Sequence, residues 1–189
     1  MNGDDPQGPF VFDTSAESWL VRSTAPGVVE WLQNYMELHP VYVSAATVIE
    51  RLNGYNRLLL HGPASERDRV LRRRNEYVGD PDRVLPIDVA VAAAAAELLA
   101  LLPDPPSPPR RSHKAAESRS DRLVRWRFDT LVAATALVNR MPVLHNNPED
   151  FEALRMAIEI HPERLGGLGP LELYRCTRLG ARVRSAGGR

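Results

Sequence analysis

The sequence has a single cysteine, few aromatic residues, no excess charge of either sign and no long hydrophobic run. Cys176 alone excludes an intramolecular disulfide framework and any zinc or iron–sulfur site that needs several thiolates. The longest apolar stretch, residues 84–103, is interrupted by Pro86 and Asp88, so the remainder is too short to span a bilayer. The acidic N-terminus has no apolar signal segment. These absences predict a cytoplasmic protein without membrane contact.

The residues that are present are typical of one globular domain: 189 residues, of which 43% are hydrophobic and 25% charged. Short apolar runs predict strands at residues 9–12, 41–43, 84–86, 142–144 and 170–174. Helical patterns separate these runs, and Thr14 or Ser15, Pro26, Ser44, Asp88 and Asn147-Pro148 are the expected helix starts. Because alternating strands and helices favour a covered parallel sheet, we expect a three-layer α/β/α sandwich with four or five short parallel strands.

Three segments differ in composition. Residues 1–8 form an acidic N-terminal extension, residues 9–175 a single domain, and residues 176–189 a basic C-terminal tail. Within the domain, five prolines at residues 103–109 and the basic stretch after them predict an insertion at about 103–120. A long helix should follow, with Val124, Phe128, Leu131, Thr135 and Val138 on one face.

Acidic residues follow three of the predicted strands, at the end where parallel sheets collect their ligands. Asp13 directly follows the first strand, Glu50 lies early in the helix after the second, and Asp150 follows the fourth. Asp129 lies in the helix that leads into the fourth strand. Because converging carboxylates repel one another, several in one cleft need a cation, and Mg²⁺ prefers carboxylate and water oxygens. One interpretation is therefore a metal site for phosphodiester hydrolysis.

Each acid also fits an ordinary structural role. Asp13 is placed to cap the helix that follows it, and Glu50 lies opposite the apolar stripe of its own helix, where it would be solvated. Asp129 is four residues after Arg125 and could pair with it, while Asp150 suits the first-turn dipole of its helix. Spacing alone leaves both interpretations open.

Four blocks of sequence around these acids carry a family resemblance. They read FDTS at residues 12–15, VSAATVIE at 43–50, DTLVAATAL at 129–137 and PVLHNNPEDF at 142–151. The third is similar to an Asp-x-x-Ile-Ala-Ala helix and the fourth to a Thr-x-Asn-x-x-Asp-Phe block. In this order they resemble the PIN-domain ribonucleases, and within that family the toxins of VapC-type toxin–antitoxin pairs, over roughly residues 9–175.

The resemblance implies a site, a cofactor and partners. The catalytic, metal-binding acids would be Asp13, Glu50, Asp129 and the more variable Asp150, supported by hydrogen bonds from Thr14 or Ser15 and from Asn147. It implies Mg²⁺- or Mn²⁺-dependent endonucleolytic cleavage of RNA, a homodimer, and a cognate antitoxin, as in a type II toxin–antitoxin system. His145 departs from the pattern, because the family usually has threonine there. The alternative is a catalytically weak PIN-like module that binds RNA or a protein.

The zero net charge does not exclude RNA, because the charges are segregated. Residues 1–40 hold six acids and one arginine, whereas residues 110–127 and the C-terminal tail are rich in arginine. Such runs are also typical of solvated surfaces. The candidate RNA-binding residues are Arg110, Arg111, Lys114, Arg125 and Arg127.

Overall fold

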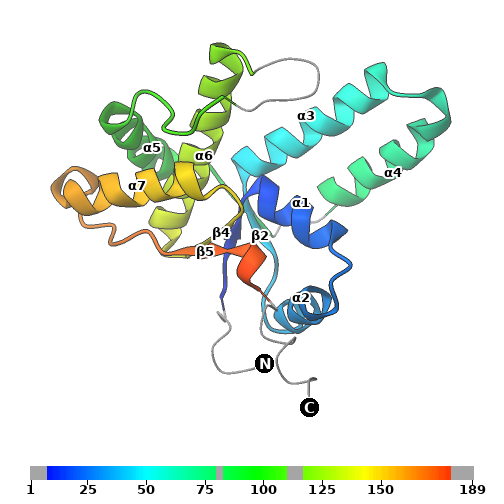
Figure 1. Cartoon of the computed structure of the whole chain (residues 1–189), viewed down its shortest axis with the longest axis horizontal. Coiled ribbons are helices and arrows are strands. Elements are labelled where there is room, and N and C mark those ends of the chain that lie inside the picture. The colour runs from blue at the N-terminus through cyan, green and yellow to red at the C-terminus, as the bar shows by residue number, and fades with distance from the viewer. Residues whose placement is uncertain (1–7, 80–82, 110–116, 180–189) are drawn as a thin grey trace.

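The computed structural model describes residues 8–79, 83–109 and 117–179. Nearly all of the acidic extension, part of the insertion and most of the basic tail lie outside these ranges. Within them, five short strands form one parallel sheet in the order β3-β2-β1-β4-β5 (Figure 1). The central strand β1 (Val11–Phe12) pairs with β2 (Tyr42–Ser44) and β4 (Val143–His145), whereas β3 (Val84–Leu85) and β5 (Leu173–Arg175) lie at the edges. The predicted parallel sheet is confirmed.

In the described ranges, seven α-helices connect and cover the strands. They are α1 (Thr14–Arg22), α2 (Pro26–Leu38), α3 (Ala45–His61), α4 (Arg67–Val78), α5 (Val89–Leu101), α6 (Arg119–Asn139) and α7 (Pro148–Ile160). Most of them start where the sequence predicts, because Ser44 caps α3, Asp88 caps α5, and prolines open α2 and α7. The first helix differs: Asp13, and neither Thr14 nor Ser15, provides its cap.

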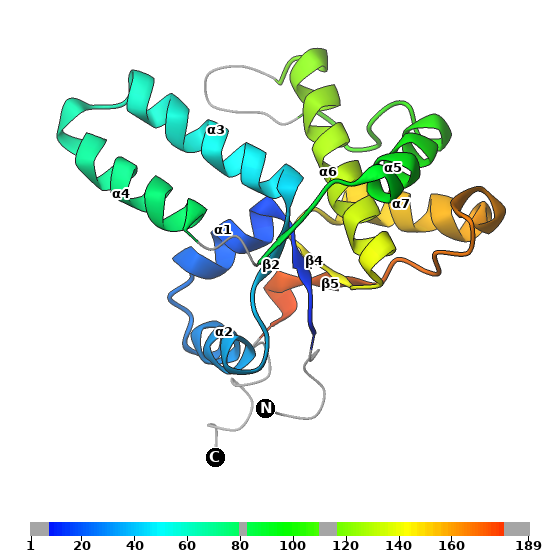
Figure 2. The same ribbon diagram turned by 180° about the vertical axis from the view of Figure 1, so that it is seen from behind.

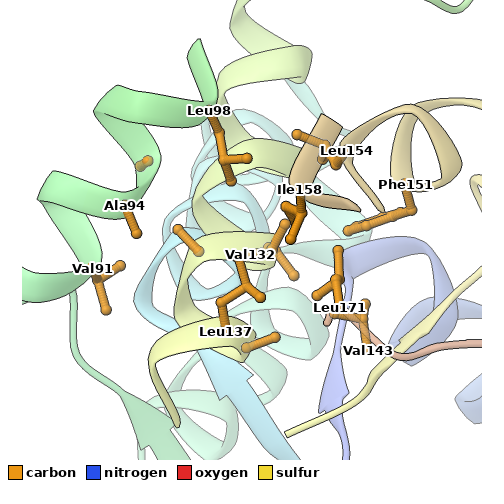
Figure 3. Packing of buried hydrophobic residues seen from close by; sticks show 14 of the residues in the cluster. Val91, Ala94, Leu98, Val132, Leu137, Val143, Phe151, Leu154, Ile158 and Leu171 are labelled. Atoms are coloured by element: carbon orange, nitrogen blue, oxygen red, sulfur yellow. The ribbon is translucent and has the colours of Figure 1, made fainter. Parts of the chain in front are cut away.

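Alternating strand residues face two hydrophobic clusters on opposite sides of the sheet, as the pleat of a strand requires. Val11 and Val143 belong to the cluster under α5, α6 and α7, which Figure 3 shows from close by. Phe12 and Leu144 belong to the cluster under α1 and α2. This arrangement gives the expected three layers. Seen from both sides, α3 and α4 run side by side and extend beyond the sheet (Figures 1 and 2).

The buried face of α6 differs from the expected one. Trp126, Thr130 and Ala133 are fully buried, whereas Val124 is 50% exposed. The helix packs against α5, α7 and α3 as well as against the sheet, so its buried surface is wider than one stripe. The indole of Trp126 also donates a hydrogen bond of 2.9 Å to the carbonyl of Leu102, which satisfies its N–H inside the core. Within the described residues, no helix is long and apolar enough to cross a membrane.

Candidate active site

The predicted acids come together at the carboxyl ends of the three central strands. Asp13 follows β1 directly, Glu50 lies in the second turn of α3 after β2, and Asp150 lies in the first turn of α7 after β4. Asp129 reaches the same place from the middle of α6. Burial raises the pKa of Asp129 well above its usual value, and repulsion from Asp13, Asp150 and Glu50 raises it further. The four carboxylates therefore form one electrostatic group.

Asp13 has both of the roles that its position suggested. Its Oδ1 accepts a hydrogen bond of 2.6 Å from the Ala16 N–H, which caps α1, and its Oδ2 accepts one of 2.8 Å from the Ser15 hydroxyl. The side chain is buried, and burial is the largest cause that raises its pKa to about 7, with repulsion from Glu50 adding to it. The hydrogen bonds from Ala16 and Ser15 act in the opposite direction. A cap of ordinary geometry thus carries a carboxylate that is unfavourable to ionise.

Polar side chains hold the neighbouring acids in place. The Thr14 hydroxyl donates to Oε2 of the partly buried Glu50, which joins the start of α1 to α3. The Asn147 amide donates to Oδ2 of Asp129 at 3.0 Å and to Oδ2 of Asp150 at 2.6 Å. Asn147 stands at the N-cap position of α7, yet its side chain does not cap that helix. Its amide bridges two carboxylates instead.

Asp150 is fully buried and its oxygens have several donors. Oδ1 accepts from the Ser107 N–H at 3.2 Å, and Oδ2 accepts from Nη1 of Arg125 at 2.6 Å as well as from Asn147. Arg125 also holds Glu117 through two hydrogen bonds of 3.1 Å. Arg125 thus forms its ion pairs with Asp150 and Glu117. The alternative in which Arg125 pairs with Asp129, four residues later in α6, is therefore wrong.

Comparison with known proteins decides the family. The PIN domain model matches residues 10–156, most of the chain. The chain belongs to the PIN domain family. No curated protein sequence matches it.

Solved structures share the fold of this PIN domain. FitAcB from Neisseria gonorrhoeae is 23% identical with a TM-score of 0.56, and the match covers 90% of this chain and 100% of that one. FitAB bound to an IR36 DNA fragment is 23% identical, with a TM-score of 0.53 and coverages of 89% and 95%. VapBC2 from Rickettsia felis, bound to a DNA fragment from their promoter, is 11% identical, with a TM-score of 0.54 and coverages of 88% and 97%. At these identities the likeness concerns the fold.

The donor set suits a hard divalent cation in its chemistry. Asp13, Glu50 and Asp129 supply carboxylate oxygens, and among the described residues no ion pair includes Asp13 or Asp129. A cation would relieve the repulsion that raises their pKa values. In the described parts of the chain, however, no three His, Cys, Asp or Glu side chains are arranged to hold a metal as they stand. The site therefore suits a metal ion in the type of its donor atoms and in its excess of negative charge. To hold the ion, the side chains of Asp13, Glu50 and Asp129 would have to turn toward a common point.

The remaining predicted residues lie in different surroundings. Arg127 is exposed on α6, and Arg125 is only 11% exposed because it is enclosed by its two carboxylate partners. Arg110, Arg111 and Lys114 lie outside the described residues. His145 is buried and packs against Phe151 with ring centroids 5.0 Å apart. Burial lowers its pKa to about 4.

Sequence reasoning missed the polar contacts beneath the acids. The buried hydroxyls of Ser44 and Thr135 are 2.9 Å apart and tie the end of β2 to α6, the helix that carries Asp129. Ser107 lies within the proline run of the insertion and donates to Asp150, and Glu117, near the end of the insertion, pairs with Arg125. The only available signal was a serine or threonine in an otherwise apolar segment, which does not identify a partner 91 residues away.

Proposed function

We propose that this PIN domain is a metal-dependent endoribonuclease that acts as the toxin of a type II toxin–antitoxin system. The observation that carries the proposal is the group formed by Asp13, Glu50 and Asp129, in which repulsion adds to burial in raising the pKa of Asp13 and of Asp129. Carboxylates that repel one another in a largely buried group are stabilised by a cation. In the proposal, these three acids hold Mg²⁺ or Mn²⁺.

The chain's own contribution is to present oriented, ionised oxygens. Ser15 orients Asp13, Thr14 orients Glu50, and Asn147 orients Asp129. When bound, the metal supplies stabilisation of the charge that develops on the phosphodiester and makes water a better nucleophile. Because the pKa of Asp13 is about 7, protons compete with the cation, so metal loading increases from about pH 6 to pH 8.

Asp150 has a positioning role in this proposal. Its two oxygens are engaged by Ser107, Arg125 and Asn147, and one of these partners also holds Asp129. Asp150 therefore acts through Asn147, by fixing the amide that orients Asp129.

The substrate and partners rest on the four blocks that resemble VapC-type toxins. That resemblance supports RNA as the substrate, a homodimer as the active form and a cognate antitoxin as the inhibitor. The fold shared with VapBC2 and with the FitAB assembly agrees with this assignment.

The test is cleavage of end-labelled single-stranded RNA with Mg²⁺ or Mn²⁺, with EDTA, and by the variant Asp129→Asn. We expect chelation to abolish cleavage, and the substitution to lower the rate by more than the ~10–100-fold that loss of an outer-shell partner costs. Asp88→Asn is the matched control, because Asp88 caps α5 through the Val91 N–H and lies on the surface. Cleavage that persists in EDTA or in Asp129→Asn contradicts the proposal. Binding without cleavage by the wild type favours the alternative of a PIN-like binding module.

A further inference from the structure

A groove of about 730 Å³ lies between α1, α3 and α4. Helices α3 and α4 extend outward from the sheet (Figure 1). We call this groove the basic groove. Its defining residues are Arg22, Arg51, Tyr55, Arg73, Tyr77 and Arg83.

The groove contains one buried carboxylate between two guanidinium groups. Glu17 is 5% exposed, and its oxygens lie 3.4 Å from Nε of Arg51 and 3.7 Å from Nη1 of Arg83. The Tyr77 hydroxyl donates a third contact to it at 3.4 Å. Burial raises the pKa of Glu17, and the charges of Arg51 and Arg83 lower it. Glu17 therefore orients the two arginines from below. Two further contacts hold them: Nη1 of Arg51 donates to the Ser18 hydroxyl at 2.8 Å, and Nη2 of Arg83 donates to the Tyr77 carbonyl at 3.4 Å.

The lining has an excess of positive charge. Four arginines face the groove, and the only described acids in its lining are Glu17 and Glu76. Arg22 and Arg73 are exposed at the rim, where they can contact a ligand without disturbing the Glu17 contacts. A groove with this positive charge favours an anionic ligand. Because several arginines line it, a ligand that carries several negative charges suits it best.

Aromatic rings lie among these arginines. The Arg83 guanidinium lies 4.5 Å from the centroid of the Tyr77 ring, and the Arg51 guanidinium lies 5.6 Å from the rings of both Tyr55 and Tyr77. Both tyrosines are partly exposed. Tyrosine rings and guanidinium planes are the surfaces on which unpaired bases stack. This combination distinguishes the groove from a site for an acidic peptide, which needs the arginines alone.

Two residues that line the groove lie close along the chain to acids of the candidate active site. Arg51 is the residue after Glu50 in α3, and Glu17 lies one helical turn after Asp13 in α1. The hydrogen bond from Thr14 to Glu50 fixes these two helices together at the acid end. A strand whose phosphodiester lies at the acids therefore enters the groove with its next nucleotides.

We propose that the basic groove binds the single strand of RNA beside the scissile phosphodiester. Arg51 and Arg83 contact a backbone phosphate, Arg22 and Arg73 contact neighbouring phosphates, and Tyr55 and Tyr77 stack on bases. This inference rests on the proposed function, since the strand it places is that enzyme's substrate.

The test measures RNA binding apart from cleavage. Fluorescence anisotropy follows a labelled RNA of about 12 nucleotides in EDTA, with a gel to verify that the RNA stays intact. The double variant Arg22→Gln/Arg73→Gln should reduce the slope of log affinity against log salt by about 1.4, since each phosphate contact contributes about 0.7 on a single strand. Tyr55→Ala should weaken binding by at least about fivefold. The control Arg155→Gln/Arg164→Gln removes the same charge from α7 and the turn after it and should bind like the wild type.

The outcomes separate this proposal from the proposed function. If the wild type binds and cleaves RNA and the groove variants match the control, the groove proposal is wrong and the nuclease remains. If the wild type neither binds nor cleaves RNA, both fail. An oligo-glutamate peptide that binds the wild type, and loses binding in the groove variants while RNA binding is kept, assigns the groove to a protein ligand and overturns the proposal. RNA that carries 4-thiouridine should photo-crosslink to Tyr55 or Tyr77, and crosslinks confined to other surfaces would also overturn it.

Discussion

Replacement of Asp13 by asparagine is expected to stabilise the metal-free protein. Asparagine keeps an oxygen that accepts the Ala16 N–H, so the cap of α1 survives, and Ser15 can still pair with the amide. The substitution removes only the charge. Removal of that charge ends the repulsion with Glu50 and reduces the one felt by Asp129.

The magnitude follows from the pKa of Asp13, which burial and Glu50 raise from 3.8 to about 7. At ~1.36 kcal/mol per pKa unit, ionisation of Asp13 costs the folded protein about 4 kcal/mol. Because the folded pKa is the higher one, the folded state retains the proton between about pH 4 and pH 7, and the free energy of unfolding falls as pH rises through that window. Weaker hydrogen bonds to a neutral amide cost about 1–2 kcal/mol. We expect Asp13→Asn to exceed the wild type by about 2–3 kcal/mol at about pH 8 and to lose that advantage at about pH 4.

Urea unfolding in EDTA at several pH values measures this difference. Comparison of variant with wild type cancels the other titrating groups, among them His145. Asp88→Asn is the control, because it removes the charge of an exposed helix cap and should change stability little at any pH. Mg²⁺ should stabilise the wild type at about pH 8 and leave Asp13→Asn unchanged, since a ligand that binds only the folded state shifts unfolding. An Asp13→Asn protein that is less stable than the wild type at the higher pH would refute the reasoning.

Two further predictions concern buried polar groups. Arg125→Met leaves Asp150 buried without its ion pair and should cost ~3–5 kcal/mol in urea unfolding, whereas Arg155→Met, at an exposed pair, should change stability little. Equal losses in the two variants contradict the role given to Arg125. Burial lowers the pKa of His145 to about 4, so an NMR titration should show its imidazole neutral down to about pH 5, and its contribution to stability should fall as pH drops from 6.5 toward 4. A midpoint near 6.5 contradicts this.

Much of the fold could be predicted because its signals are local. Pro40 and Ser44 bracket β2, and Asp88 and Pro148 mark the starts of α5 and α7, so these elements lie within a residue or two of their expected positions. The strand order could not be predicted in this way, since it depends on which apolar faces pair across the whole chain. The prediction that Val124 lies on the buried face of α6 was wrong for a related reason. A helix that is covered on several sides has no single apolar stripe.

The acids of the site could be predicted from their positions after strands, whereas the contacts between them could not. Asp13, Glu50 and Asp150 each follow a strand, and that placement is readable from sequence. The hydrogen bond that Ser107 donates to Asp150 joins residues 43 positions apart, and nothing local to either residue indicates it. The same holds for Glu17, whose partners Arg51 and Arg83 come from other elements.

The central position of β1 has a consequence for protein synthesis. β1 pairs with β2, formed early in the chain, and with β4, formed more than a hundred residues later. Half of the acid group therefore exists in an emerging nascent chain long before the other half, and the group closes only after residue 150 has been translated. A prematurely terminated chain that ends before β4 lacks Asp150 and the bridging amide of Asn147. It also lacks the second of the two strands that pair with β1. Whatever reaction the site performs, it cannot begin while the ribosome is still adding the middle of the chain.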